Sequence, residues 1–494
     1  MFSQICIIGS GPAGSVLAVS LAEKGHEVLV IEAGSSAPDF TLEAVTDRIS
    51  VSGETDIKFG FSRQIGGATN LWAGRIAPLE TCDFEKGWPV SRDEMELYYT
   101  QASEILGIKD VGNFSEDEPC SGAFSGLKSV TLKPFLWAKS PFNAGQYLTL
   151  ATQKYKNLQI LTNRRAAKIN CDNKKIISIE LIDTCEKHQG VPRETVSADL
   201  FILAAGGIET PRILLNSDLG GSAVGRYFST HPKADMAVLK LNKRTSTQDP
   251  LFTDMPLGAG TQRKGLGFPE TIQKEHDLLN HYVQLSPLVE FKATRLFEKV
   301  KGSSLFKSKF IDSSSLMKGL LPAIGLIVFE AISKLAGLQR KTTIFMLRGF
   351  LDQYPNHENQ LTLSDKKDSF GLPLINIDWT FTEKDKASVI RFFDLLDKSL
   401  KQNNIGHIEY SEMRNMQDWP LIGIHSHFMG TTRMGNDPQT SVTDKNAKLH
   451  EVENLYISGP SLFSTYGYAN PVYTIVALAL RLADHISEKL GQKP

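Results

Sequence analysis

The sequence has few cysteines, little net charge and no long apolar run. Its five cysteines are odd in number and follow no metal-binding spacing, which argues against a disulfide framework and indicates the reduced thiols of a cytoplasmic protein. With 54 Lys and Arg against 55 Asp and Glu, no nucleic-acid partner is expected. No uncharged run reaches the roughly 20 residues that span a bilayer. The opening residues, MFSQICIIGSG, lack the basic and apolar regions of a signal peptide, so we expect no export by such a signal.

The length of the chain sets the expected number of domains. At 494 residues it exceeds the size that one hydrophobic core usually serves, so about two domains of unequal size are expected. A charged content of 22% argues against long disordered stretches.

The N-terminal segment predicts a βαβ unit that binds a dinucleotide. An apolar strand over residues 4–8 leads into Gly-x-Gly-x-x-Gly, a helix over residues 13–24 and a second strand ending in an acid. The first glycine allows a tight turn, the second lets the backbone approach a pyrophosphate, and the third lets the helix pack on the strand. The acid is expected to accept the ribose hydroxyls. The predicted contacts are Gly9, Gly11, Pro12, Ala13, Gly14 and Glu32. The spacing alone does not separate NAD from FAD.

Two further glycine-rich stretches extend this prediction. In residues 63–75, RQIGGATNLWAGR, small residues allow close approach to a flat ring; the alternative is a mobile surface loop. In residues 199–217 an apolar strand runs into a Gly-Gly pair, and a helix is expected to begin near Thr210 and Pro211. This return to the sheet implies a discontinuous cofactor domain. The expected contacts are Gly67, Asn70, Trp72, Gly74, Ala205 and Gly206.

The C-terminal part carries the candidate catalytic residues. His427, in HFMGTTRMG, is suited to take a proton near neutral pH. Asn470 is expected to cap a buried helix that starts with Pro471 and Val472 and whose N-terminus faces the cofactor. His425 and His427 could form a metal pair, but no nearby carboxylate or thiol completes a site, so no metal is expected. His231 is interpreted as structural.

Residues 291–348 combine many Lys and Arg with an uncharged run from Gly319 to Phe329. This pattern is typical of a patch that docks peripherally on a membrane or on a partner. The alternative is a core helix with a solvated basic face.

Five motifs, in order, resemble the glucose-methanol-choline (GMC) oxidoreductases, especially the bacterial branch related to pyranose oxidases and sugar dehydrogenases. They are GSGPAG with its downstream acid, GGATNLWAG, GWPVS, AAGGIETPRILLNS, and HFMGTTRMG with YANPVYTIVALALRLAD. The resemblance implies an α/β fold, α+β overall. A discontinuous Rossmann-like FAD-binding domain (1–85, 145–231 and 421–494) would be joined to a substrate domain built on an antiparallel sheet (86–144 and 232–420).

The resemblance also decides for FAD over NAD and assigns roles to residues. His427 matches the family's active-site His, and Asn470 matches its second catalytic residue. Some pyranose oxidases attach the flavin through a His in the loop matching GGATNLWAG; this chain has none there, so non-covalent FAD is expected. Gly459, before Pro460, stands where many members have an Asp that contacts the ribityl chain, so backbone N–H groups are expected to substitute.

The predicted function is oxidation of a CH–OH group of a sugar, glycoside or polyol to a carbonyl, by hydride transfer to flavin N5 with His427 as base. Dioxygen, a quinone or a cytochrome remains open as the electron acceptor. One alternative is oxidation of a lipid or sterol alcohol, prompted by the apolar run. Another is a non-catalytic flavin-binding subunit that docks on a membrane complex.

Overall fold

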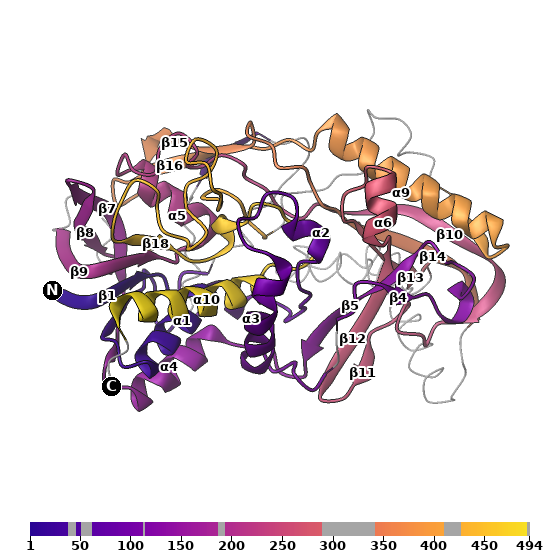
Figure 1. The fold of residues 1–494 in the computed structure, drawn as a ribbon, viewed down its shortest axis with the longest axis horizontal. Coiled ribbons are helices and arrows are strands. Elements are labelled where there is room, and N and C mark those ends of the chain that lie inside the picture. Colours follow the sequence, from indigo (N-terminus) through magenta and orange to yellow (C-terminus); the bar gives the residue numbers. More distant parts are fainter. Residues whose placement is uncertain are drawn as a thin grey trace, which may run out of the picture.

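The computed structural model describes residues 1–37, 46–50, 62–111, 114–185, 193–288, 341–409 and 426–491. Two large sheets lie at opposite ends of the long axis (Figure 1). All five cysteines have free thiols, as predicted. Within these ranges no helix has both the length and the apolar character needed to cross a membrane.

The first sheet is built around parallel strands. In spatial order it contains β6 (Leu158–Leu161), β2 (Val28–Ile31), β1 (Phe2–Ile8), β9 (Arg193–Leu203), β8 (Lys175–Asp183) and β7 (Arg164–Asp172), with β18 (Leu455–Ile457) paired to β9. The strands β6, β2, β1, β9 and β18 run parallel, whereas β7 and β8 form an antiparallel hairpin that continues onto β9. The carboxyl-terminal parts of β1 and β9, and all of β2 and β18, are apolar and buried, as expected for a sheet covered on both faces.

The second sheet is antiparallel. In spatial order it contains β17 (Gly406–Glu409), β10 (Lys233–Ser246), β14 (Lys341–Phe350), β13 (Tyr282–Pro287), β12 (Gly260–Gly267), β5 (Thr131–Ala138) and β4 (Glu118–Pro119), with β11 (Met255–Leu257) paired to β12. A small third sheet contains β15 (Gln360–Lys367), β16 (Pro373–Asp378) and β3 (Thr46–Ser50). Among the described residues the buried apolar side chains form two large clusters, one mainly around each large sheet, and a small third one.

Helices cover both sheets (Figure 1). They are α1 (Pro12–Glu23), α2 (Thr81–Phe84), α3 (Arg92–Ile105), α4 (Ala144–Lys154), α5 (Gly206–Leu215), α6 (Glu270–Glu275), α9 (Glu383–Gln402) and α10 (Val472–Leu490), with 3-10 turns at η2 (Gly67–Asn70), η3 (Gly122–Phe124) and η5 (Pro460–Leu462). Helix α10 packs against α1 and α3. Helix α9 begins at a capping box between Thr382 and Asp385 and packs on β17.

The predicted fold class is confirmed, and the N-terminal βαβ unit lies within a residue or two of the expected bounds. The domain boundaries stay a prediction: α3, from the segment assigned to the substrate domain, packs on α10 of the other. Helix α5 begins at Gly206, four residues before the expected start at Thr210. Of residues 291–348, only 341–348 are described, as part of β14; the run from Gly319 to Phe329 lies outside the described residues.

Candidate active site

A cavity of about 810 Å³ connects the two large sheets. One end lies at the carboxyl ends of β1, β2 and β9, which is where open parallel sheets bind their ligands. The other end is lined by the first residues of β10 and the last of β14. The cavity therefore joins the carboxyl edge of the parallel sheet to the β10–β14 wall of the antiparallel sheet.

The three N-terminal glycines have the three predicted geometries. Gly9 has a φ of +104°, and a Cβ there would lie 2.6 Å from the carbonyl oxygen of Ala204. A Cβ on Gly14 would overlap the carbonyl oxygen of Gly9, so this glycine lets α1 pack on β1. Gly11 has an ordinary φ of −65° and no atom within 4 Å of a Cβ position. Among the described residues nothing requires glycine at position 11, so the cavity space in front of it fits a bound group.

The Glu32 carboxylate holds this glycine turn through hydrogen bonds. Its Oε2 accepts hydrogen bonds from Ser10 N (3.0 Å) and Ser10 Oγ (2.6 Å), and its Oε1 accepts one from Gly34 N (2.8 Å). Burial raises the pKa of its carboxyl group. Glu32 lines the cavity, as expected for a ribose acceptor, but it also fixes the glycine turn, a role that the sequence did not suggest.

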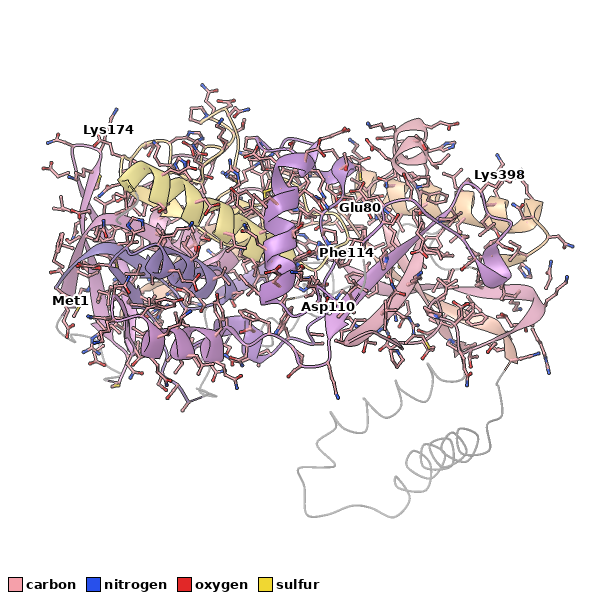
Figure 2. All side chains as sticks on the ribbon, turned by 60° about the horizontal axis from the view of Figure 1, so that its bottom comes forward. Met1, Glu80, Asp110, Phe114, Lys174 and Lys398 are labelled. Atoms are coloured by element: carbon pink, nitrogen blue, oxygen red, sulfur yellow. The ribbon has the colours of Figure 1, made fainter. Side chains whose placement is uncertain are left out.

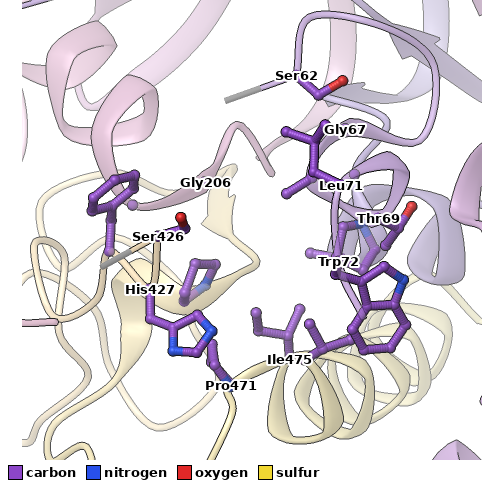
Figure 3. Close-up of a pocket in the computed structure, with 18 of the residues that line it drawn as sticks. Ser62, Gly67, Thr69, Leu71, Trp72, Gly206, Ser426, His427, Pro471 and Ile475 are labelled. Atoms are coloured by element: carbon purple, nitrogen blue, oxygen red, sulfur yellow. The ribbon is translucent and has the colours of Figure 1, made fainter. Parts of the chain in front are cut away.

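The loop of residues 63–75 forms the facing wall (Figure 3). Gly67 has a φ of +52°, and its Cβ position lies 3.1 Å from Gly11 Cα, so the two glycine motifs approach each other. Trp72 lines the cavity and donates through Nε1 to the carbonyl oxygen of Phe142 (2.9 Å). Asn70 was expected to contact the cofactor; in the structure its amide donates to the carbonyls of Ile65 and Gly67, and the residue does not line the cavity.

Helix α5 begins earlier than predicted, and a contact with the segment that follows His427 explains this. Pro211 lies inside α5 and has no N–H to donate to the carbonyl of Gly207, four residues earlier. The Thr431 hydroxyl donates to that carbonyl instead (2.8 Å). A Cβ on Gly207 would overlap the carbonyl oxygen of Phe428, so this glycine lets the His427 segment lie directly on α5.

We expect Thr431→Val to lower the free energy of unfolding by about 1–3 kcal/mol, because it leaves the buried carbonyl of Gly207 without a donor. Chemical denaturation followed by fluorescence measures this. Thr432→Val is the matched control, since the buried hydroxyl of Thr432 has no partner among the described residues and its loss should cost little. Equal destabilisation by both changes would contradict the assigned hydrogen bond.

His427 lies against His231, the residue that was interpreted from the sequence as structural. An isolated antiparallel bridge pairs Ser229 with Met429. Because the two segments run in opposite directions, His231, two residues after Ser229, lies opposite His427, two residues before Met429. The two Nδ1 atoms are 2.9 Å apart, and His231 Nε2 lies 3.1 Å from the carbonyl oxygen of Tyr466. His231 is fully buried, whereas His427 is partly exposed at the cavity wall (Figure 3).

These contacts define the tautomers. The Tyr466 carbonyl can only accept, so His231 Nε2 carries a proton and, in the neutral ring, His231 Nδ1 is an acceptor. His231 Nδ1 therefore accepts a hydrogen bond from His427 Nδ1–H. With both rings neutral, His427 Nε2 is the unprotonated nitrogen, the form that a general base requires.

Asn470 and the start of α10 lie at the same wall. The predicted cap is wrong: α10 starts at Val472 after Pro471, and Asn470 Nδ2 donates to the carbonyl of Arg75 (3.0 Å) instead of capping the helix. The buried Asn470 Oδ1 has no hydrogen-bond partner in the described part of the chain. Pro471, Val472 and Ile475 line the cavity, so the positive end of the α10 dipole faces it.

A buried ionic network holds the segment before Asn470. Lys133 Nζ lies 2.5 Å from Glu80 Oε2 and 2.6 Å from Asn280 Oδ1, and Tyr468 donates to Glu80 Oε1 (3.1 Å). The Asn280 amide donates in turn to Asp83. Glu80 lies near the middle of the molecule, far from both Met1 and Lys398 (Figure 2). The network therefore ties β5 of the eight-stranded sheet to the segment that precedes Asn470.

The cavity brings together most of the predicted residues. Those that line it are Gly9, Gly11, Pro12, Ala13, Glu32, Gly67, Trp72, Gly74, Ala205, Gly206, His427, Pro460, Asn470, Pro471 and Val472. Gly14, Asn70 and Gly459 do not line it. Gly459 has a φ of +132° and faces Ala13 of α1. His425 lies outside the described residues.

Sequence reasoning missed the charged wall at the other end. Lys233, Arg75 and Arg348 all line the cavity there. Burial, together with the charges of Arg75 and Arg348, lowers the pKa of Lys233 from 10.5 to about 8. A lysine that follows His-Pro gives no signal of this placement, because it depends on how β10 pairs with β14.

Lys233 should destabilise the folded protein. Its folded pKa, about 8, lies below its unfolded value, so the unfolded chain binds more protons between pH 8 and 10.5 and stability rises with pH in that window. Below pH 8 the full penalty is present. We therefore expect Lys233→Met to raise the free energy of unfolding at pH 7 by about 1–3 kcal/mol, with the gain fading above pH 8. Urea unfolding at pH 7 and pH 10 measures this, and a gain that is the same at both would contradict it.

One cavity combines the carboxyl edge of a Rossmann-type sheet, a glycine turn with open space beside it, and an unprotonated imidazole nitrogen. This combination defines a class, the nucleotide-cofactor-dependent oxidoreductases. Comparison with known sequences specifies it: GMC oxidoreductase models match residues 101–233 and 355–479, and an NAD(P)-binding Rossmann-like model matches residues 7–37. The chain belongs to the GMC oxidoreductase family, whose members are FAD flavoproteins acting on CH–OH donors.

Individual relatives are distant but cover the whole chain. The chain is 22% identical to 2-methyl-1,2-propanediol dehydrogenase of Mycolicibacterium austroafricanum, over 99% of this chain and 96% of that one. It is 23% identical to the fructose dehydrogenase large subunit of Gluconobacter japonicus, over 99% and 98%. Among solved structures, pyridoxine 4-oxidase from Mesorbium loti matches with a TM-score of 0.58 at 17% identity, over 98% and 99%, which supports the fold alone.

Proposed function

We propose that the protein oxidises a CH–OH group of a sugar, glycoside or polyol to a carbonyl, with His427 as the base. The observation that carries the proposal is the hydrogen-bond chain from Tyr466 O through His231 to His427, because it leaves His427 Nε2 unprotonated at the cavity wall. An alcohol becomes a good hydride donor only as its O–H proton leaves. His427 Nε2 takes that proton, and His231 keeps the ring oriented.

Bound FAD supplies the acceptor for the hydride of the alcohol carbon. Its pyrophosphate fits the open space at Gly11 and the N-terminus of α1, and the Trp72 loop would hold its ring. Because residues 63–75 contain no His, attachment is proposed to be non-covalent. The N-terminus of α10 stabilises negative charge near it by about 1–2 kcal/mol.

Asn470 is proposed to bind the same substrate oxygen as His427. Its link to the Arg75 carbonyl uses one N–H of Nδ2 and fixes the amide plane, and the second N–H of Nδ2 is the donor proposed for the substrate oxygen, which gives its only proton to His427. A substrate with several hydroxyl groups can hydrogen-bond to the polar side chains of this cavity wall. Relatives named for fructose and for paromamine also support a sugar or polyol.

Anaerobic flavin reduction tests the function. Holoenzyme is mixed with a panel of sugars, glycosides, polyols and hydrophobic alcohols, and the flavin absorbance is followed. Bleaching by at least one polyhydroxylated member, followed by reoxidation with air or a quinone, is expected. Bleaching only by sterol or long-chain alcohols would favour the lipid alternative, and no bleaching by any member would sink the proposal.

A further inference from the structure

Lys233 lies close in sequence to His231, the residue that contacts the candidate base His427. It is the first residue of β10, two positions after His231, and it lines the same cavity as His427. Residues two apart in an extended chain point to the same side. The register pairs Lys233 with Phe350 of β14, and Lys233 Nζ lies 4.7 Å from the centre of the Phe350 ring. Lys233 is therefore part of the wall that a substrate at His427 would meet.

The cations around Lys233 differ in how they are neutralised. Arg348 Nε lies 2.8 Å from Asp235 Oδ1, and Arg75 Nη2 lies 3.2 Å from Asp254 Oδ2. In the part of the chain that the structure describes, Lys233 has no carboxylate partner, only the face of Phe350. Partly buried ammonium groups are normally paired, because removing them from water is costly. Among the described residues this wall thus has positive charge in excess of its carboxylate counter-ions.

The excess charge is separate from the place where the cofactor's phosphates fit. The glycine turn from Gly9 to Gly14 and α1 lie at the seven-stranded sheet, whereas Lys233 and Arg348 lie on strands of the eight-stranded sheet. The cavity spans both. An anion that pairs with Lys233 is therefore not the pyrophosphate held at α1.

We propose that the β10–β14 end of the cavity binds an anionic group, a carboxylate or a phosphate, carried by the alcohol that is oxidised, with Lys233 as its ion-pair partner. This inference rests on the proposed function and narrows its substrate class to acidic or phosphorylated sugars and polyols. The anion supplies the counter-charge that the wall lacks, and its charge-assisted hydrogen bond to Lys233 orients the hydroxyl toward His427.

Matched alcohols test the substrate class. Glucose, glucuronate and glucose 6-phosphate form one set, and glycerol, glycerate and glycerol 3-phosphate form another; anaerobic flavin reduction of the holoenzyme gives a specificity constant for each. We expect an anionic member to exceed its neutral parent by at least tenfold, and Lys233→Met to reduce that ratio by at least tenfold. The carboxylate and phosphate arms distinguish the two anions.

Lys240→Met is the matched control. Lys240 lies on the same strand but pairs with Glu409 (2.6 Å) at the sheet edge, so its loss should leave the ratio unchanged. A neutral parent that reacts as well as both anions, or a ratio that Lys233→Met does not change, would overturn the inference.

A titration that needs no turnover separates this inference from the proposed function. Acetate and inorganic phosphate are added to oxidised holoenzyme, and the perturbation of the flavin absorbance gives a dissociation constant. We expect this constant to rise at least tenfold in Lys233→Met and not in Lys240→Met. Anion binding that depends on Lys233 without reduction by any alcohol would sink the proposed function alone. Turnover without such binding would sink the anion subsite alone.

Discussion

Replacement of His427 by Gln lowers the rate of flavin reduction by substrate about 10²–10⁴-fold while the protein keeps its bound FAD. The reason is that Gln has no nitrogen that can take the alcohol proton, although it fills similar space at the cavity wall. Stopped-flow absorbance under anaerobic conditions measures the rate, and the flavin to protein absorbance ratio measures cofactor content. A variant that reduces its flavin as fast as the parent would rule out His427 as the base.

The tautomer assignment adds a sharper expectation for His231. His231→Leu removes the acceptor for His427 Nδ1–H, so the rate should fall and the acidic limb of its pH profile should shift. His231→Gln keeps one acceptor and one donor and should restore much of the loss. Because the two rings act as a unit, the double variant His231→Leu with His427→Gln should be no slower than His427→Gln alone. Additive losses would indicate that His231 acts independently.

Gly207→Ala should lower the rate of flavin reduction about 10²-fold and the free energy of unfolding by about 3 kcal/mol. The added Cβ overlaps the carbonyl oxygen of Phe428, so the segment that carries His427 must move away from α5. Backbone preference does not explain such a loss, since Ala is favoured over Gly in a helix by about 1 kcal/mol. Single-turnover kinetics and urea denaturation measure the two effects.

Gly126→Ala serves as the control for this substitution. Gly126 is exposed, and its nearest neighbour, Asn403, lies at an ordinary 3.4 Å from the Cβ position. It should leave both rate and stability near those of the parent. If Gly207→Ala behaves in the same way, the close contact between α5 and the His427 segment does not position the base.

Local patterns were sufficient to predict the nucleotide-binding edge. The strand, glycine turn, helix and acid of residues 4–32 are contiguous, so spacing alone gives their arrangement, and Gly9, Gly11 and Gly14 have the expected geometries. His427 and Asn470 were assigned through the family resemblance, and the structure places both at the cavity.

The parts that sequence reasoning missed depend on contacts between distant segments. His231 meets His427 only because Ser229 bridges Met429, 200 positions away along the chain. Asn470 does not cap α10; its amide Nδ2 donates instead to the Arg75 carbonyl, 395 positions earlier in the chain. Such contacts leave no local periodicity or spacing to read.

The parallel sheet is assembled from pieces that are synthesised far apart in time. Strand β1 pairs with β9, and β9 pairs with β18, so the central strands come from residues near 5, 200 and 456. The cavity wall also needs the start of α10 at Val472. A nascent chain therefore has the glycine cradle early but no complete flavin pocket until α10 has left the ribosome. Cofactor loading is consequently delayed until β18 and α10 have been synthesised, and FAD added during synthesis should not bind a chain stalled before β18.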